Sequence, residues 1–89
     1  MILNVVQAQY VEKYQVEILF NNAETLLVDL EETIMHDSRR IFFPLRDVEY
    51  FKSFQIKFNT ITWENEADFA PEFLLELGKS QLEHLTAKH

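Results

Sequence analysis

Five carboxylates and no basic residue lie between residues 64 and 76, and such a cluster raises three kinds of chemistry. Paired carboxylates can act as general acid and base, carboxylates can hold a metal ion, and an acidic surface can bind a basic partner. The five side chains are Glu64, Glu66, Asp68, Glu72 and Glu76. Their spacing also fits the end of a strand followed by the first turns of a helix. We therefore interpret the cluster as solvated surface that a basic protein partner could contact.

The other residues that carry chemistry form no recognisable site. The sequence has no cysteine, which excludes disulfides and thiolate metal sites, and its single glycine excludes a glycine-rich phosphate loop. His36 and Asp37 could ligate a metal ion, but two adjacent ligands make a weak signal. Glu31 and Glu32 point to different faces of any helix and need a pocket for acid–base work. We expect no enzymatic activity, no metal site and no cofactor.

The charge is strongly acidic but unevenly distributed. The formal net charge of −7 disfavours nonspecific binding to nucleic acid, which needs clustered Lys and Arg. Residues 39–57 nevertheless hold five basic side chains against two acidic ones. The five are Arg39, Arg40, Arg46, Lys52 and Lys57. This segment leaves open an alternative function, a regulatory domain linked to nucleic-acid binding.

The first third of the chain has the period of strands. Apolar and polar residues alternate over 6–10, 14–20 and 26–30, which predicts a β-meander over residues 4–30 with one buried face. Asp29 and Glu32 have the spacing of a capping box, so a short helical turn should end near His36. Residues 41–47 are apolar but contain Pro44, which favours an irregular segment. Asp47 can cap a second short helix after it.

A second hairpin and a helix are predicted for the rest. Phe54, Ile56 and Phe58 alternate with polar residues and predict a fourth strand, and the alternation ending at Trp63 predicts a fifth with the indole in the core. Pro71 suits the first turn of a helix, and Gly78 suits its end. The residues of this helix expected to cover the core are Phe73, Leu74 and Leu77.

Together these elements predict an α+β fold. We expect one antiparallel sheet of four to five strands, a β-meander plus a C-terminal hairpin, with short helices and a C-terminal helix packed on it. At 89 residues the chain makes a single domain over 1–78, followed by a helical tail over 79–89.

The tail begins with a second capping-box spacing, Ser80 and Glu83. Leu82 and Leu85 would extend one apolar stripe along it. This stripe either packs on the protein's own sheet or docks against a partner or a second copy, which would make a homodimer.

Two segments of the sequence, "FFPLRDVEYF" and "ITWENEADFAPEFL", resemble a bacterial family, the domain of unknown function twenty-four forty-two. The matching positions are Leu45, Asp47, Phe51, Trp63, Asn65, Asp68, Pro71 and Glu72. Two positions depart: Glu64 stands where the family often has proline, and Glu66 where it often has glycine. The resemblance covers roughly residues 4–77 and implies a small α+β domain. It also implies neighbouring genes of toxin–antitoxin type, and it supplies no catalytic residue.

The sequence therefore predicts a small non-catalytic interaction protein, an antitoxin-like or accessory subunit that binds a partner protein. That partner could be a basic, toxin-like protein. The five carboxylates with Leu82 and Leu85 are the candidate contact residues. The first residues lack a basic segment and a long apolar core, so we expect no signal peptide, no membrane anchor and a cytoplasmic location.

Overall fold

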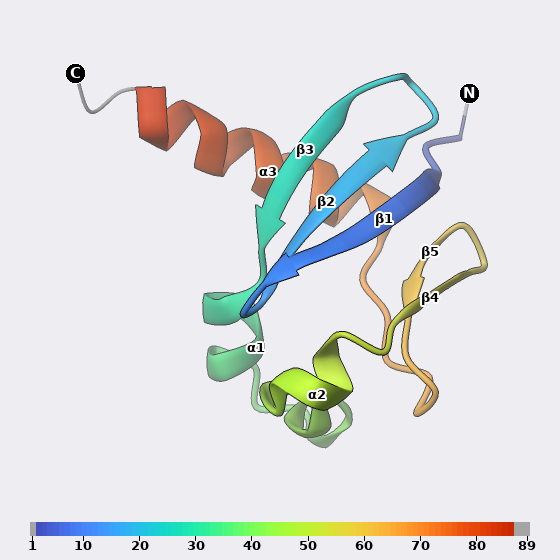
Figure 1. The fold of residues 1–89 in the computed structure, drawn as a ribbon, viewed down its shortest axis with the longest axis vertical. Helices are drawn as coiled ribbons and strands as arrows, with labels where there is room; N and C mark the ends of the chain where they lie inside the picture. The colour runs from blue at the N-terminus through green and yellow to red at the C-terminus, as the bar shows by residue number, and fades with distance from the viewer. Residues whose placement is uncertain (1, 87–89) are drawn as a thin grey trace.

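The protein is described by a computed structural model that covers residues 2–86, with the side chains of residues 85 and 86 excepted. It has the predicted α+β class (Figure 1). The strands are β1 (Val5–Glu12), β2 (Gln15–Phe20), β3 (Thr25–Asp29), β4 (Gln55–Lys57) and β5 (Thr60–Thr62). The helices are α1 (Glu31–His36), the 3-10 helix η1 (Arg40–Arg46), α2 (Val48–Phe51) and α3 (Pro71–Thr86).

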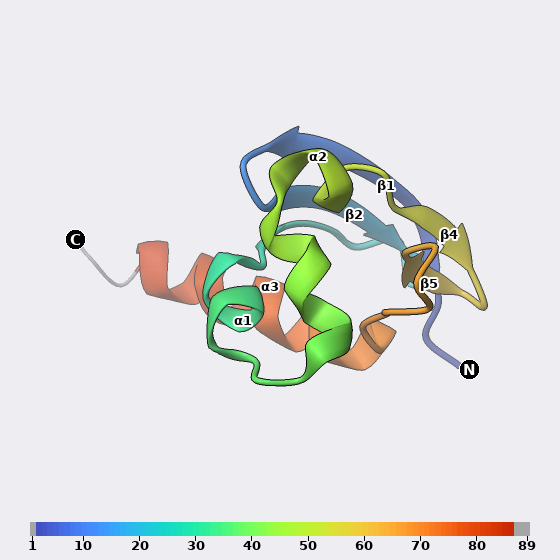
Figure 2. The same ribbon diagram turned by 90° about the horizontal axis from the view of Figure 1, so that it is seen from below.

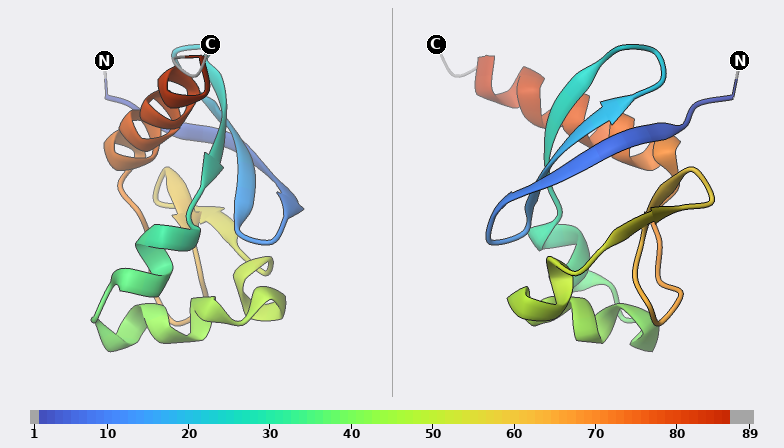
Figure 3. Two further views of the ribbon diagram at one scale, coloured as in Figure 1. Left: turned by 90° about the vertical axis from the view of Figure 1, so that its left-hand side faces the viewer. Right: turned by 45° about the vertical axis from the view of Figure 1, so that its right-hand side comes forward.

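The first three strands form the predicted antiparallel meander in the order β1-β2-β3. Val16 pairs with Val28 and Ile18 with Leu26, and all four side chains are buried on one face. That face is covered by α3, which runs along the sheet (Figure 3, left). The alternation of apolar and polar residues thus gives this sheet one buried side, as the sequence indicates.

The second hairpin does not join this sheet. Strands β4 and β5 form a separate two-stranded sheet, so the five strands make two sheets where the sequence predicts one. Within residues 2–86 one main-chain hydrogen bond outside the strand ladders, from the Val5 N–H to the Asn59 carbonyl oxygen at 2.8 Å, links β1 to the hairpin turn. Phe58 and Asn59 have φ values of 54° and 70°, as a type I′ turn requires. Phe58 therefore lies in the turn, 85% exposed, and not in the predicted fourth strand.

The core joins the sheet to the short helices through aromatic contacts. Trp63 is 2% exposed, which confirms its predicted place in the core. Its indole Nε1–H donates to the Phe51 carbonyl oxygen at 2.7 Å, and the two ring centroids are 5.6 Å apart. Helix α2 and the 3-10 helix before it lie at the end of the molecule that is turned toward the viewer in Figure 2. They add Leu45 and Phe51, both fully buried, to the core.

Helix α3 continues past the position where the sequence predicts its end. Gly78 lies inside the helix with negative φ, and Ser80 does not begin a second helix. A Cβ on Gly78 would lie 3.1 Å from the Leu26 Cβ and 3.1 Å from Cγ2 of Val28. The glycine is thus used for close approach to β3 and not for a turn. Within residues 2–86 no helix, α3 included, is long and apolar enough to cross a membrane.

The helix starts agree with the predictions only in part. Asp47 caps α2 as predicted, because its side chain accepts from the Glu49 N–H at 3.1 Å. The capping box at α1 does not form: Leu30 occupies the cap position, and the Asp29 carboxylate accepts from the Glu31 N–H at 3.0 Å. On α3, Leu74 is buried as predicted, but Phe73 is 41% exposed and stacks on Phe69.

Candidate functional site

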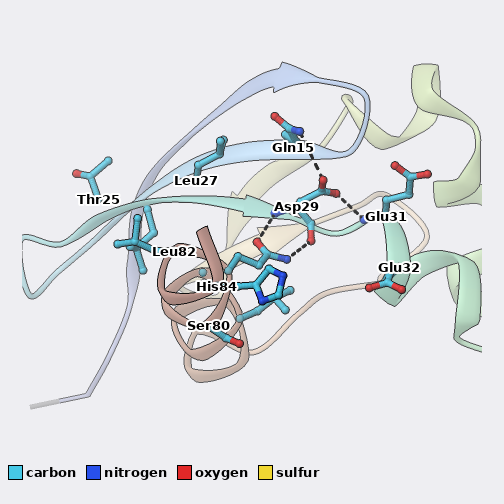
Figure 4. A pocket seen from close by; sticks show the side chains of 13 residues that line it. Gln15, Thr25, Leu27, Asp29, Glu31, Glu32, Ser80, Leu82 and His84 are labelled. Carbon is cyan, nitrogen blue, oxygen red and sulfur yellow. Dashed lines mark hydrogen bonds between the residues drawn. The ribbon is translucent and has the colours of Figure 1, made fainter. Parts of the chain in front are cut away.

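An open groove of about 780 Å³ lies between β3 and the C-terminal half of α3, with α1 at one end (Figure 4). It exists because α3 crosses behind the sheet and projects past the β3 edge, as two views agree (Figures 1 and 3). Its apolar lining is Leu26, Leu27, Leu77 and Leu82. Leu27 and Leu82 are 50% and 53% exposed, so the groove combines an unpaired strand edge with accessible apolar surface.

The electrostatic field of this groove is negative. Asp29, Glu31 and Glu32 line it, and no Lys or Arg does. His84 is the one histidine among the lining residues. Clustered carboxylates beside an apolar wall raise the local concentration of cationic groups. The groove is therefore suited to a ligand that carries positive charge and some apolar surface.

A side-chain clamp fixes α3 to the strand edge. The Asp29 N–H donates to Oε1 of Gln81 at 2.9 Å, and Nε2 of Gln81 donates to the Asp29 carbonyl oxygen at 2.8 Å. These two bonds satisfy both main-chain groups of Asp29. They leave its carboxylate at the groove, where it contacts the Glu31 N–H (Figure 4).

The predicted acidic contact residues are not brought together. Glu64 and Glu66 lie in the loop after β5, Asp68 forms a bridge with Thr62, and Glu72 and Glu76 are exposed on α3. Glu66 and Asp68 share a second hollow of about 440 Å³, whereas none of the five lines the β3–α3 groove. Leu82 lies in that groove, and the side chain of Leu85 lies outside the described residues.

An ion pair between Asp37 and Arg39 lines the second hollow. NH2 of Arg39 lies 2.7 Å from Oδ2 of Asp37, and the Arg39 guanidinium lies 4.6 Å from the Phe42 ring centroid. Hydrogen bonds from the Arg39 side chain and main chain lower the pKa of Asp37 to about 2. The carboxylate is thus ionised and already paired at neutral pH, so its role here is structural.

Most of the basic segment 39–57 is engaged within the molecule. The Arg46 guanidinium donates to the Met35 carbonyl oxygen at 3.2 Å and to the Asp37 carbonyl oxygen at 3.3 Å, at the C-terminal end of α1. It also lies 4.5 Å from the Phe43 ring centroid. Lys52 pairs with Glu49 at 3.1 Å. Cations at a helix C-terminus complement its dipole, so these residues have structural partners.

Other chemistry has little support in the geometry. Among residues 2–86 no group of three or more His, Cys, Asp or Glu side chains is placed to hold a metal ion. Nδ1 of His36 lies 3.0 Å from the Glu32 carbonyl oxygen within α1. The Tyr14 hydroxyl donates to the Arg46 carbonyl oxygen, and burial raises the pKa of Tyr14. That tyrosine therefore stays neutral at pH 7.

The groove residues that sequence reasoning missed are Leu27, Asp29, Glu31, Glu32 and Gln81. The sequence did contain one signal. As the last strand of a meander, β3 has no following strand to pair with and lies at an edge. A second signal is the three-residue spacing of Gly78 and Gln81, which places both on the same face of a continuous helix.

The two motif segments have a structural role in this fold. Trp63 bonds to Phe51, and Asn65 links its loop to η1 by donating from Nδ2 to the Ile41 carbonyl oxygen at 2.8 Å. Oδ1 of Asn65 accepts from the Ala67 N–H at 3.1 Å. Glu66, at the position where glycine is common in the resembling family, has a φ of 73°. The loop thus has left-handed backbone geometry at a residue other than glycine.

No curated protein and no solved structure matches the chain. A family model with the description "Protein of unknown function (DUF2442)" matches residues 5–80. This range runs from the first residue of β1 to the middle of α3 and includes both motif segments. The chain therefore belongs to the DUF2442 family of proteins of unknown function.

Proposed function

We propose that the chain is a small non-catalytic interaction protein, an antitoxin-like or accessory subunit, which binds a basic partner protein through the β3–α3 groove. The observation that carries this proposal is the groove lining. Leu27 and Leu82 stand half-exposed beside the carboxylates of Asp29, Glu31 and Glu32, with no Lys or Arg among the lining residues. Apolar anchors supply affinity, and complementary charge supplies specificity and association rate.

The overall charge supports the same partner class. A formal net charge of −7 attracts a basic protein and repels phosphate backbones. The nucleic-acid alternative receives less support, because Arg39, Arg46 and Lys52 of the basic segment already pair within the molecule. We therefore put forward the protein-binding function alone.

Affinity purification from cells that naturally express the protein tests this proposal. The tagged chain should recover a basic protein, with a pI above about 9, after nuclease treatment. The purified pair should then re-form a stoichiometric complex that weakens by about tenfold or more between about 50 and about 500 mM salt, because exposed charges are screened. Recovery of nucleic acid alone, or of no basic protein that re-forms the complex, would contradict the proposal.

A further inference from the structure

The hydrogen bonds at the two ends of the β2–β3 ladder show which main-chain groups of β3 face outward. The Leu30 N–H donates to the Tyr14 carbonyl oxygen at 2.9 Å, and the Phe20 N–H donates to the Glu24 carbonyl oxygen at 2.9 Å. Antiparallel pairs alternate between bonded and non-bonded, and the register between these ends is unbroken. The even-numbered residues of β3 therefore bond to β2, and the odd-numbered residues direct their N–H and C=O groups away from it.

The outward-facing residues are Thr25, Leu27 and Asp29. Gln81 satisfies both main-chain groups of Asp29. Within residues 2–86 no hydrogen bond engages the outward N–H and C=O groups of Thr25 or Leu27. Both residues line the groove and are exposed. An unpaired strand edge of this kind is a ready template for another strand.

We propose that this edge takes an extended basic segment of the partner as a fourth strand, an inference that rests on the proposed function. The segment pairs with the main chain of Thr25 and Leu27. It lies on the part of α3 that projects past the sheet, where Leu77 and Leu82 contact its apolar side chains. Strand addition draws affinity from main-chain hydrogen bonds and specificity from alternate side chains.

Two features set the length of the added strand and the end at which it should carry a basic residue. The Gln81 side chain already makes hydrogen bonds with the N–H and C=O groups of Asp29, which a residue of an added strand would otherwise occupy. The new ladder therefore spans Thr25 to Leu27 and stops at the clamp. Beyond the clamp lie the carboxylates of Glu31 and Glu32 (Figure 4). A Lys or Arg at that end of the segment is therefore placed to contact them.

Charge favours a basic segment over a second copy of this chain. A second copy of this chain would bring another formal net charge of −7 to a groove that is already lined by Asp29, Glu31 and Glu32. Like charges placed together at an interface oppose binding. A segment rich in Lys or Arg brings the opposite charge to the same carboxylates.

An NMR titration of the ¹⁵N-labelled full chain with a short peptide of alternating lysine and valine tests the proposal. The amides of Thr25 and Leu27 should shift most, because they gain main-chain partners. A peptide with glutamate in place of lysine should bind at least about tenfold more weakly, since the groove is acidic. Shifts centred on residues 39–57 or 64–68, or no saturable binding of the basic peptide, would overturn the inference.

A matched pair of variants tests the main-chain contact itself. Leu27→Pro removes one outward N–H and leaves the β2 ladder intact, as proline is tolerated where an edge N–H faces solvent. Leu27→Val keeps that N–H and most of the apolar surface. Leu27→Pro should weaken the peptide by about tenfold or more, and Leu27→Val by less than about threefold. Equal affinities for the two variants would overturn strand addition.

A peptide modification gives the same test without altering the fold. Two peptides are N-methylated, one at every lysine and one at every valine, so that each loses the N–H groups of one edge. Strand addition predicts that one of the two loses binding by about tenfold and the other keeps it. Equal loss, or no loss, would contradict it.

The outcomes for this inference and for the proposed function are distinct. If Leu27→Pro, still folded by its melting curve, binds the basic partner recovered from cells as wild type does, the strand site is wrong and the proposed function stands. If wild type recovers no basic partner, the proposed function fails. A dimer of the chain that Leu27→Pro dissociates would give the edge to a second copy and overturn the basic segment as its occupant.

Discussion

At the scale of single residues, Trp63 joins the two motif segments through its ring contact and its hydrogen bond to Phe51. Trp63→Ala should lower the free energy of unfolding by about 3–5 kcal/mol, the usual range for a buried large aromatic. Phe58→Ala is the matched control: that ring is 85% exposed, and its loss should change stability by no more than about 0.5 kcal/mol. Urea denaturation measures both. Similar values for the two variants would mean that Trp63 does not anchor the core.

Glu66 occupies a backbone conformation that glycine prefers, with a φ of 73°. Glu66→Gly should raise the free energy of unfolding by about 0.5–1 kcal/mol, because relief of left-handed strain exceeds the added flexibility of the unfolded chain. Glu64→Gly removes the same charge from the same loop at a negative φ and should cost about 0.5–1 kcal/mol. Denaturation curves of both proteins test this. If both variants lost stability equally, the loop would not be strained at Glu66.

The pKa of Asp37 is lowered from 3.8 to about 2 by its hydrogen bonds with Arg39. Because the folded pKa lies below the unfolded value, this ion pair contributes stability above pH 3.8, and the contribution is lost as pH falls toward 2. NMR titration of the Asp37 carboxyl should give a midpoint near 2 in wild type. In Arg39→Gln the midpoint should move up toward 3.8. An unchanged midpoint in that variant would exclude Arg39 as the cause.

Residues whose roles depend on neighbours close in the sequence were predictable, and the residues of the groove were not. Asp47 caps a helix that starts at the next residue. Trp63 is buried as predicted, although it follows β5 and all three residues of that strand are buried too. The clamp between Asp29 and Gln81 joins residues 52 positions apart. No local pattern records that distance, because it depends on how α3 crosses the sheet.

At the scale of elements, Gly78 shows how packing overrides a local preference. The sequence predicts that this glycine ends the helix, yet the close approach of α3 to β3 gives it another role inside the helix. The hairpin β4–β5 is a case in which the local pattern predicts the elements correctly but not their packing. Its alternating pattern is correct for strands, but all three β4 residues are exposed, and the pattern does not specify which sheet they join.

Gly78→Ala tests the contact between α3 and β3. Alanine gains about 1 kcal/mol in helix propensity, but its Cβ would lie 3.1 Å from Leu26 and Val28. Overpacking of this kind costs about 1–3 kcal/mol, so a net loss of about 1 kcal/mol is expected. Ser80→Ala, exposed on the same helix, should gain about 0.5 kcal/mol. Thermal unfolding of both variants checks this, and a stabilised Gly78→Ala protein would mean that the helix is not so closely packed.

At the scale of the whole molecule, the two edges of the main sheet differ. The β1 edge lies beside the β4–β5 hairpin, to which the Val5 N–H is bonded, whereas the β3 edge opens onto the projecting part of α3 (Figure 1). The net negative charge of the chain favours a basic partner at that open edge. The homodimer through Leu82 and Leu85, one of the alternatives that the sequence leaves open for the tail, remains a prediction that light scattering of the full chain can test.

If a basic partner binds at the β3–α3 groove, charge reversal there should reduce its recovery far more than charge reversal elsewhere on the surface. Three tagged proteins are compared in one purification: wild type, Glu31→Lys with Glu32→Lys, and Glu64→Lys with Glu66→Lys. Both pairs reverse exposed charges equally, but only the first pair lines the groove. Reversal at the groove should lower recovery of the basic protein by about tenfold or more, and reversal in the loop after β5 should lower it by less than about threefold. Equal recovery by the two charge-reversed proteins, or a greater loss from the loop pair, would contradict binding at the groove.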